Sequence, residues 1–383
     1  MTLPHGVTSG STSGSANDAT HPSQDQPDQH GTHWQERART QGIFLHTGWR
    51  SAGTWVWSRL RAVPSVQAFY EPLSTVLGDL KLADIPAIEP ARTSGHPPLK
   101  APYYEEYRSF IRENARGVIG YRKYFSTDRF GSTPDADFPA LQAYLKSLCD
   151  GAAGQGKVPV FKFCRSQGRM PWLRSAFPDA MHVAVVRNPA SQFASGWLLN
   201  QEWHNPFFVA APFRVLGLNQ TEPVVQRVIE ACEVRLPPDP PVSMEQYAAV
   251  CEQYARTAEG TNAYRAFVAL WILAVSRMRD DQDLVLDIDE VGQSPSYAAD
   301  LRAQFIAQAD VAPDFSGARN LVDETRQSAT RMVGVDGGAI RAIHSAAMKF
   351  LVSEGGPDKA QAKVLELARE KLALAGELSQ RWR

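Results

Sequence analysis

The segment that decides the fold is residues 43–55, with the sequence IFLHTGWRSAGTW. Residues 43–47 form an apolar run of strand length, small residues punctuate the turn that follows, and residues 55–60 are amphipathic. This order predicts a buried strand, a tight loop and a helix. Successive backbone N–H groups of such a loop can point at one anion, so the segment predicts a phosphate-binding loop.

Four more strand signals follow, and helical patterns separate them. Their residues are Val66 to Tyr70, Val158 to Phe163, His182 to Val186 and Leu284 to Ile288. Strands without polar alternation, interleaved with helices, predict an α/β fold: a P-loop-type parallel sheet flanked by helices on both faces. Further helical patterns at 244–256, 262–278 and 358–378 predict a helical C-terminal part. Ligands of such sheets bind at the carboxyl ends of the strands.

Composition narrows the range of partners. The chain has 383 residues, and its 40 Lys and Arg against 41 Asp and Glu give a net charge of -1. We therefore expect neither nucleic acid nor an anionic membrane as the main partner. The longest apolar run, near residues 266–275, is about half the roughly 20 residues that a membrane span needs. Four cysteines without a C-x-x-C pair, and an N-terminus without an apolar signal segment, predict a cytoplasmic location.

The chain divides into two unequal parts. Residues 1–38 are polar and nearly free of aliphatic side chains, which predicts a disordered tail. Residues 39–383 are expected to form one α/β domain with loop insertions near 74–150 and 197–243. The tail holds His30 and His33, but an H-x-x-H pair without further ligands is a poor metal site, so no metal site is predicted.

The phosphate loop differs from that of a metal-dependent nucleotidase. Gly48 and Gly53 have the spacing of the two glycines in a Walker A motif. Thr54 and Trp55 occupy the positions of its lysine and its magnesium-binding Ser or Thr, so both of these residues are missing. A cation, Arg50, lies inside the loop instead. This suits a donor whose charge is neutralised by the protein rather than by Mg²⁺.

A second motif begins at the predicted fourth strand. An apolar run ends in Arg187-Asn188-Pro189, and Ser195 follows eight residues after the arginine. Proline suits the first position of a helix. The spacing takes the chain off the strand and along a new helix, so that the guanidinium and the hydroxyl can converge on one anion.

Both motifs resemble those of the PAPS-dependent sulfotransferases, which use 3′-phosphoadenosine-5′-phosphosulfate (PAPS) as donor. The loop and the R-N-P-x-x-x-x-x-S pattern occur in the family's order, and residues 285–291 are weakly similar to its late strand; the likeness spans roughly residues 42–310. It points to a bacterial-like branch similar to the glutamate-base sulfotransferases. The resemblance implies that Arg187 and Ser195 bind the 3′-phosphate of PAPS. It also implies that the 5′-phosphosulfate is bound by Arg50, Ser51, Ala52, Gly53, Thr54 and Trp55. For the ring of Trp55 two roles stay open, stacking on adenine and packing in the core.

One loop residue departs from the family pattern. Ala52 stands where glycine is usual, which is harmless if its φ is negative and otherwise strains the loop.

The resemblance also implies roles in catalysis. Sulfuryl transfer passes through a loose, in-line transition state, which requires positioning, leaving-group stabilisation and a base. Arg50 is the expected leaving-group stabiliser, Glu71 the expected base and Lys162 a contact of the sulfuryl group. Soluble branches place a histidine base where this chain has Arg165, which favours Glu71. The alternatives without a catalytic role are that Glu71 is a surface glutamate and that Lys162 is an ordinary lysine at the end of a strand.

Several questions stay open at this point. The acceptor is expected to be a small molecule or a carbohydrate with a hydroxyl or amine, and five tyrosines are either its surface or core residues: Tyr103, Tyr104, Tyr107, Tyr121 and Tyr124. His46 is expected to be structural, and His204 is a weak candidate base. A small-molecule kinase on a related fold and a catalytically inactive nucleotide-binding protein are the alternatives. The oligomeric state is not predicted.

Overall fold

The structure is a computed structural model of the chain. It describes residues 41–88, 96, 99–238, 243–279, 283–328, 334–355, 361–380 and 382. The predicted tail, with His30 and His33, lies outside the described residues.

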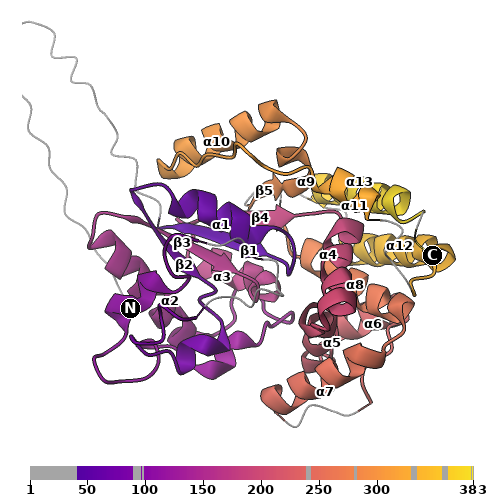
Figure 1. The fold of residues 1–383 in the computed structure, drawn as a ribbon, viewed down its shortest axis with the longest axis horizontal. Helices are drawn as coiled ribbons and strands as arrows, with labels where there is room; N and C mark the ends of the chain where they lie inside the picture. The colour runs from indigo at the N-terminus through magenta and orange to yellow at the C-terminus, as the bar shows by residue number, and fades with distance from the viewer. Residues whose placement is uncertain are drawn as a thin grey trace, which may run out of the picture. The chain divides into compact units, whose positions relative to one another are not determined.

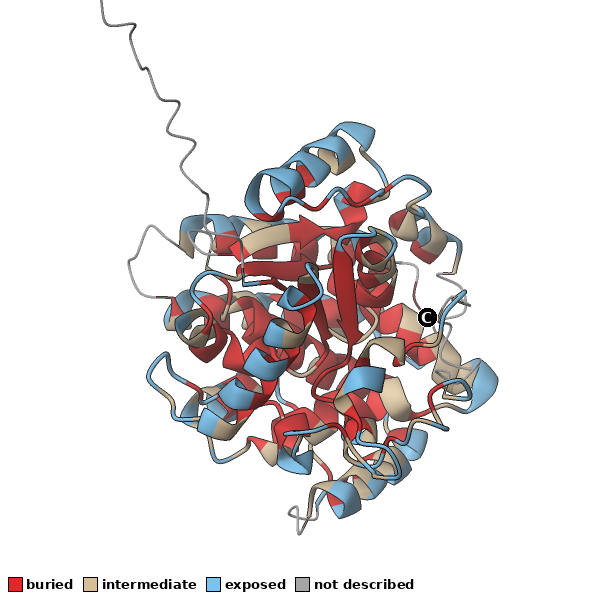
Figure 2. Cartoon of the chain, turned by 90° about the vertical axis from the view of Figure 1, so that its left-hand side faces the viewer, coloured by how far each residue is buried: buried red, intermediate tan, exposed pale blue. Residues whose placement is uncertain are grey.

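A five-stranded parallel sheet forms the centre of the described fold (Figure 1), and its strand order is β2-β3-β1-β4-β5. The strands are β1 Ile43–Thr47, β2 Val66–Tyr70, β3 Val158–Phe163, β4 Met181–Val186 and β5 Asp283–Asp287. All five predicted strands are confirmed to within one residue. The strands are buried along nearly their whole length (Figure 2), which explains their lack of polar alternation.

Helices flank this sheet and make up most of the C-terminal part, as predicted. The α-helices are α1 Gly53–Arg61, α2 Pro139–Ala153, α3 Met170–Ala176, α4 Pro189–Trp203, α5 Phe207–Leu218, α6 Pro223–Ala231, α7 Met244–Thr257, α8 Gly260–Val275, α9 Ile288–Val291, α10 Pro295–Ala309, α11 Leu321–Gln327, α12 Gly337–Glu354 and α13 Ala362–Ser379. Short 3-10 helices are η1 Thr75–Gly78, η3 Glu105–Phe110, η4 Lys123–Ser126 and η5 Gln167–Arg169. Within the described ranges, no helix has both the length and the apolar character to cross a bilayer.

Two apolar cores hold these layers together. One is built from the sheet with α1, α2, α3 and α10, and includes Trp57, Phe161 and Phe305. The other joins one face of β4 to α4, α5, α8, α12 and α13, and includes Phe193 and Phe213. The second core ties the C-terminal helices to the strand that carries the second motif.

The segment 197–243 differs from the predicted loop insertion. It contains the end of α4, all of α5 and all of α6. Pro212 lies within α5 and did not prevent the helix, because Phe213 and Leu216 are fully buried against the second core. The segment 74–150 is largely irregular, with short 3-10 helices before α2.

Candidate functional site

The carboxyl ends of four strands meet at one cavity of about 990 Å³. The loop after β1, Glu71 after β2, Arg165 after β3 and Arg187 after β4 all line it. The chain leaves the neighbouring strands β1 and β4 in opposite directions along the sheet, toward β2 and β5 respectively. Such a reversal opens a crevice at the strand ends, so the fold itself places the cavity.

The loop after β1 has a strained backbone. Arg50 and Ala52 have φ of 65° and 62°, and Glu71 on the opposite wall has φ of 48°. Left-handed conformations of non-glycine residues are costly and persist where the surrounding structure enforces them, often at functional sites. The condition under which Ala52 would be harmless, a negative φ, is therefore not met.

Gly53 is required by close packing at the start of α1. A Cβ atom on this residue would lie 2.6 Å from Cγ2 of Thr47. Thr47 in turn donates a hydrogen bond of 2.6 Å from its hydroxyl to the carbonyl of Phe163. The first turn of α1 is thereby held against the ends of β1 and β3. Gly53 and Thr54 line the cavity, and the N–H groups of a first helical turn have no intrahelical acceptors.

Arg50 crosses the cavity to the second motif. Its Nε and Nη2 donate to Oγ of Ser195 at 3.0 and 2.7 Å, and its guanidinium lies 4.8 Å from the ring centroid of Phe208. Burial lowers the pKa of Arg50 to about 10, so the side chain remains charged at neutral pH. The loop cation and the serine predicted for the 3′-phosphate are thus direct partners.

Arg187 lies at the base of the same cavity. Its Nη1 donates to the carbonyl of Arg50 at 2.9 Å, and within the described ranges its buried Nε has no hydrogen-bond partner. No carboxylate of the described residues forms an ion pair with it, and burial lowers its pKa to about 10. Arg187 and Ser195 both line the cavity, and the serine is bonded to Arg50. That they converge on one anion stays a prediction.

Three buried residues hold the turn that carries Arg187. Asp289 accepts hydrogen bonds from the backbone N–H and the Nδ2 of Asn188 at 2.8 and 2.9 Å. Nζ of Lys371, on α13, lies 3.1 Å from Asp289 and 2.5 Å from Asp287. The C-terminal helix thereby supports the turn that carries Arg187, although it lies far from that turn in sequence.

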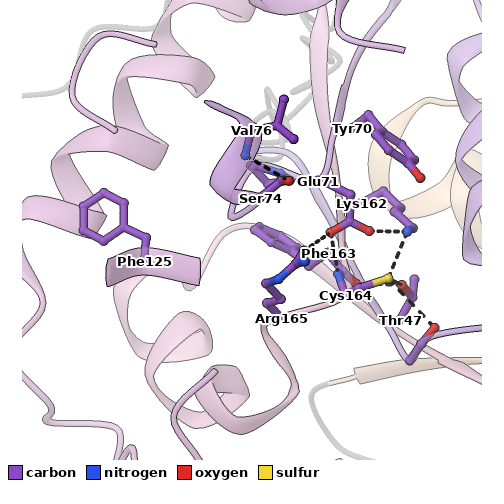
Figure 3. Close-up of polar contacts among 12 residues, drawn as sticks. Thr47, Tyr70, Glu71, Ser74, Val76, Phe125, Lys162, Phe163, Cys164 and Arg165 are labelled. Carbon is purple, nitrogen blue, oxygen red and sulfur yellow. Dashed lines mark hydrogen bonds and ion pairs between the residues drawn. The ribbon is translucent and has the colours of Figure 1, made fainter. Parts of the chain in front are cut away.

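Glu71 is the centre of a buried charge network (Figure 3). Its Oε1 pairs with Nζ of Lys162, and its Oε2 accepts from the backbone N–H of Cys164 and from Nη1 of Arg165, both at 3.2 Å. Lys162 also lies 2.9 Å from Sγ of Cys164. Glu71 is therefore a buried residue and not a surface glutamate.

These contacts set the protonation states of the network. Burial alone would raise the pKa of Glu71, but Lys162 and Arg165 lower it below its usual value. Burial would lower the pKa of Lys162, but Cys164 and Glu71 raise it well above its usual value. Burial raises the pKa of Cys164 to about 11, so its thiol is neutral. At neutral pH the group is therefore a carboxylate between two cations.

The remaining wall beside Glu71 is neutral and partly aromatic. Burial lowers the pKa of His96 to about 3, with help from the charges of Lys162 and Arg50, and burial raises that of Tyr104 to about 12. Of the five tyrosines, Tyr103 and Tyr107 are core, Tyr121 is half-buried against the core, Tyr104 is buried but lines the cavity, and Tyr124 is exposed.

Sequence reasoning missed several cavity residues. The wall of the cavity also includes His96, Cys164, Arg319 and Thr325. Arg165 was noticed only as a departure from the family, and its cavity position was not foreseen. The others carry no local signal, because they lie in irregular segments or on helices whose position only the folded chain determines.

Of the remaining candidates His46, His204 and Trp55, Trp55 lines the cavity. His46 is structural, as expected: it is buried, 2.8 Å from the hydroxyl of Ser166 and 3.0 Å from His182. His204 ends α4 with φ of 51° and does not line the cavity. Trp55 does line it, half-buried, with its ring centroid 6.0 Å from that of Phe315.

Comparisons with protein-family models, with curated proteins and with solved structures find no match to this chain. Within the described residues no cluster of histidine, cysteine, aspartate or glutamate side chains is placed to hold a metal ion.

Proposed function

We propose that this protein is a PAPS-dependent sulfotransferase that moves a sulfuryl group to a hydroxyl or amine of a small-molecule or carbohydrate acceptor. The observation that carries the proposal is Arg187: a buried guanidinium that lines the cavity beside a phosphate-type loop and is paired with no carboxylate of the described residues. A buried cation of this kind is costly unless a ligand supplies the opposite charge.

The donor fits the half of the cavity above β1, β4 and β5. The loop and the N–H groups that begin α1 would bind the 5′-phosphosulfate, and Arg187 would bind the 3′-phosphate. Ser195, bonded to Arg50 in the structure, would contact both the arginine and the bound nucleotide. Trp55 lines the same half and offers its ring to adenine.

The transfer step follows from these positions. The acceptor oxygen or nitrogen forms a bond to sulfur while the bond from sulfur to the bridging phosphate oxygen breaks. The electron pair of that bond leaves on adenosine 3′,5′-bisphosphate, where Arg50 stabilises the growing negative charge. Glu71 takes the proton of the acceptor.

The charge network suits this sequence of events. Glu71 is ionised and able to accept a proton, but the pairing with Lys162 makes it a weak base. A sulfuryl group near Lys162 would share the positive charge of the lysine. The carboxylate would then become a stronger base in the presence of donor.

Calorimetric titration tests the donor assignment. Adenosine 3′,5′-bisphosphate and 5′-AMP are titrated with and without Mg²⁺ into wild type and Arg187→Ala. We expect the bisphosphate to bind at least about tenfold more tightly without metal, since one charge-assisted contact is worth roughly 1.5–3 kcal/mol, and Arg187→Ala to abolish that preference. Arg369→Ala removes an exposed arginine of α13 and is the matched control.

The opposite results have clear meanings. A protein that binds both nucleotides equally has no 3′-phosphate site, and the donor assignment is then wrong. Binding that needs Mg²⁺, together with ATP-dependent phosphorylation of an acceptor, would instead support a small-molecule kinase.

A further inference from the structure

In the half of the cavity above β2 and β3, two cationic side chains lie beside one carboxylate. Glu71 is already neutralised by Lys162, yet Arg165 adds a second cation beside the same carboxylate. Figure 3 shows Lys162 and Arg165 on opposite sides of the Glu71 carboxylate. Lys162 lies on the side of Thr47, the last residue of β1, and Arg165 lies on the other side, so the two cations would face different parts of a bound substrate pair.

Arg165 has most of its hydrogen-bonding capacity free for a ligand. Its side chain is 14% exposed and lines the cavity. With respect to the described residues, its guanidinium donates one hydrogen bond, from Nη1 to Glu71. Since a guanidinium carries several N–H donors in a planar fork, it can still bind a carboxylate, sulfate or phosphate group.

Arg214 adds a second unbalanced charge nearby. It lies on α5 with its guanidinium 5.4 Å from the ring centroid of Phe207, which itself lines the cavity. Among the described residues its side chain forms no hydrogen bond or ion pair, although the charge of Glu252 acts on it without direct contact. Burial lowers its pKa to about 10, and the positive charge of Arg165 contributes to the same shift. The two arginines therefore act on each other across the aromatic wall.

Arg165 and Arg214 are both half-buried, and of the two only Arg165 pairs with a carboxylate, that of Glu71, which Lys162 already neutralises. The local charge is therefore positive. Such an excess of positive charge is unfavourable in the empty cavity and becomes favourable when a ligand brings an anion. The donor would meet this need only in part, because its sulfuryl group approaches Lys162 whereas its phosphates belong above β1 and β4, and β1 separates β3 from β4.

We propose that the acceptor carries an anionic group close to the hydroxyl or amine that is sulfated, and that Arg165 binds this group while Arg214 adds attraction from behind Phe207. The proposal rests on the proposed sulfotransferase function and narrows its acceptors to anionic ones. It also assigns a role to the arginine that stands in place of a histidine base: recognition of the acceptor, because a guanidinium stays protonated.

Matched acceptor pairs test this directly. Transfer from PAPS is measured to 4-hydroxyphenylacetate and to its neutral amide, and to glucuronate and its neutral amide. We expect the anionic member of at least one pair to have about tenfold higher kcat/KM, the size of one charge-assisted contact. Arg165→Gln should remove that preference, and Arg165→Lys should keep part of it.

Arg214→Gln separates acceptor recognition from effects on the base, because Arg214 does not touch Glu71 whereas Arg165 does. It should lower kcat/KM about threefold for the anionic member only, a smaller effect than that of Arg165→Gln, because its charge would act on the anion without direct contact and partly screened by solvent. Arg112→Gln removes an exposed arginine outside the cavity lining and should change neither member.

The proposal is overturned if the neutral members are used equally well, if Arg165→Gln lowers both members of a pair alike, or if no anionic member binds to protein saturated with adenosine 3′,5′-bisphosphate. Calorimetry with the same preparations tells the two failures apart. If the bisphosphate binds and the anionic preference is missing, only the acceptor class is wrong. If the bisphosphate itself fails to bind, the sulfotransferase assignment fails.

Discussion

Arg50 and Ser195 are 145 residues apart in the chain, and two hydrogen bonds from the guanidinium to one hydroxyl join them across the cavity. This contact links the loop after β1 to the helix after β4. It orients the one cation of the loop and stacks it on Phe208. The two motifs therefore form a single site with a preset geometry, which lowers the entropic cost of binding an anion.

Ser195→Ala should weaken binding of adenosine 3′,5′-bisphosphate about tenfold, because the hydroxyl is lost and Arg50 is released. The free energy of unfolding should fall by only about 1 kcal/mol, the net worth of a part-buried hydrogen bond. Calorimetric titration and urea unfolding measure the two quantities. Ser147→Ala, on α2 outside the cavity, is the control and should leave nucleotide binding unchanged.

Ala52→Gly should stabilise the protein. Ala52 has φ of 62°, a conformation that costs a non-glycine residue about 1 kcal/mol and costs glycine almost nothing. Ala62, just past the end of α1, has φ of -71°, so Ala62→Gly should destabilise by about 0.5–1 kcal/mol. Urea unfolding of both variants measures the change in the free energy of unfolding, which should be positive for Ala52→Gly and negative for Ala62→Gly. A decrease in both variants would show that the loop is not strained at Ala52.

Lys371→Met should cost about 3–5 kcal/mol at pH 7, because Asp287 and Asp289 are left as buried carboxylates without their cation. Burial already raises the pKa of Asp287 to about 6, and loss of the lysine raises it further. When the pKa of Asp287 in the folded protein lies above its unfolded value of about 3.8, the folded state takes up a proton first as the pH falls. The variant therefore regains part of its unfolding free energy at lower pH. Urea unfolding at pH 7 and pH 5 should show a smaller deficit at pH 5.

The exposed Lys363 of the same helix provides the control for that experiment. Lys363→Met should change the unfolding free energy by less than about 0.5 kcal/mol at both pH values. A deficit of Lys371→Met that stays the same at pH 5 would contradict the ion-pair explanation and point to lost packing.

Acid should destabilise the protein through its buried histidines. Burial lowers the pKa of His182 and of His344 to about 4, below the unfolded value of about 6.5. Their contribution to stability is complete above pH 6.5 and is lost as the pH falls toward 4. At pH 5 each should cost about 2 kcal/mol, and His344→Gln should reduce the drop between pH 7 and pH 5 by that amount.

Glu71→Gln should lower turnover at least about a hundredfold, the usual worth of a general base, while binding of adenosine 3′,5′-bisphosphate stays within about threefold of wild type. A glutamine keeps the size of the side chain and can still accept from Cys164, but it cannot take a proton. Unchanged turnover with Glu71→Gln would show that another group is the base, and unchanged turnover with both Glu71→Gln and Arg50→Ala would favour the inactive nucleotide-binding protein.

The strands, the first helix and both motif positions could be predicted because their signals are local. An apolar run of five residues becomes a strand wherever a sheet can cover it, and small residues before an amphipathic stretch make a turn into a helix. The helix α5 could not be predicted because its signal is not local. Its apolar run contains Pro212 and follows Pro206, and only burial against α7 and α8 makes it helical.

By itself the sequence determined the α/β class, the five strands and the presence of a cationic loop with a later arginine, since these depend on hydrophobic periodicity and on neighbours in the chain. Tertiary structure alone decided that Ser195 meets Arg50, that Ala52 has a positive φ, that Glu71 lies between Lys162 and Arg165, and that Lys371 supports the turn at Arg187. The physical reason is that partners and burial set charge state and backbone strain, and both come from residues brought together over long distances in the chain.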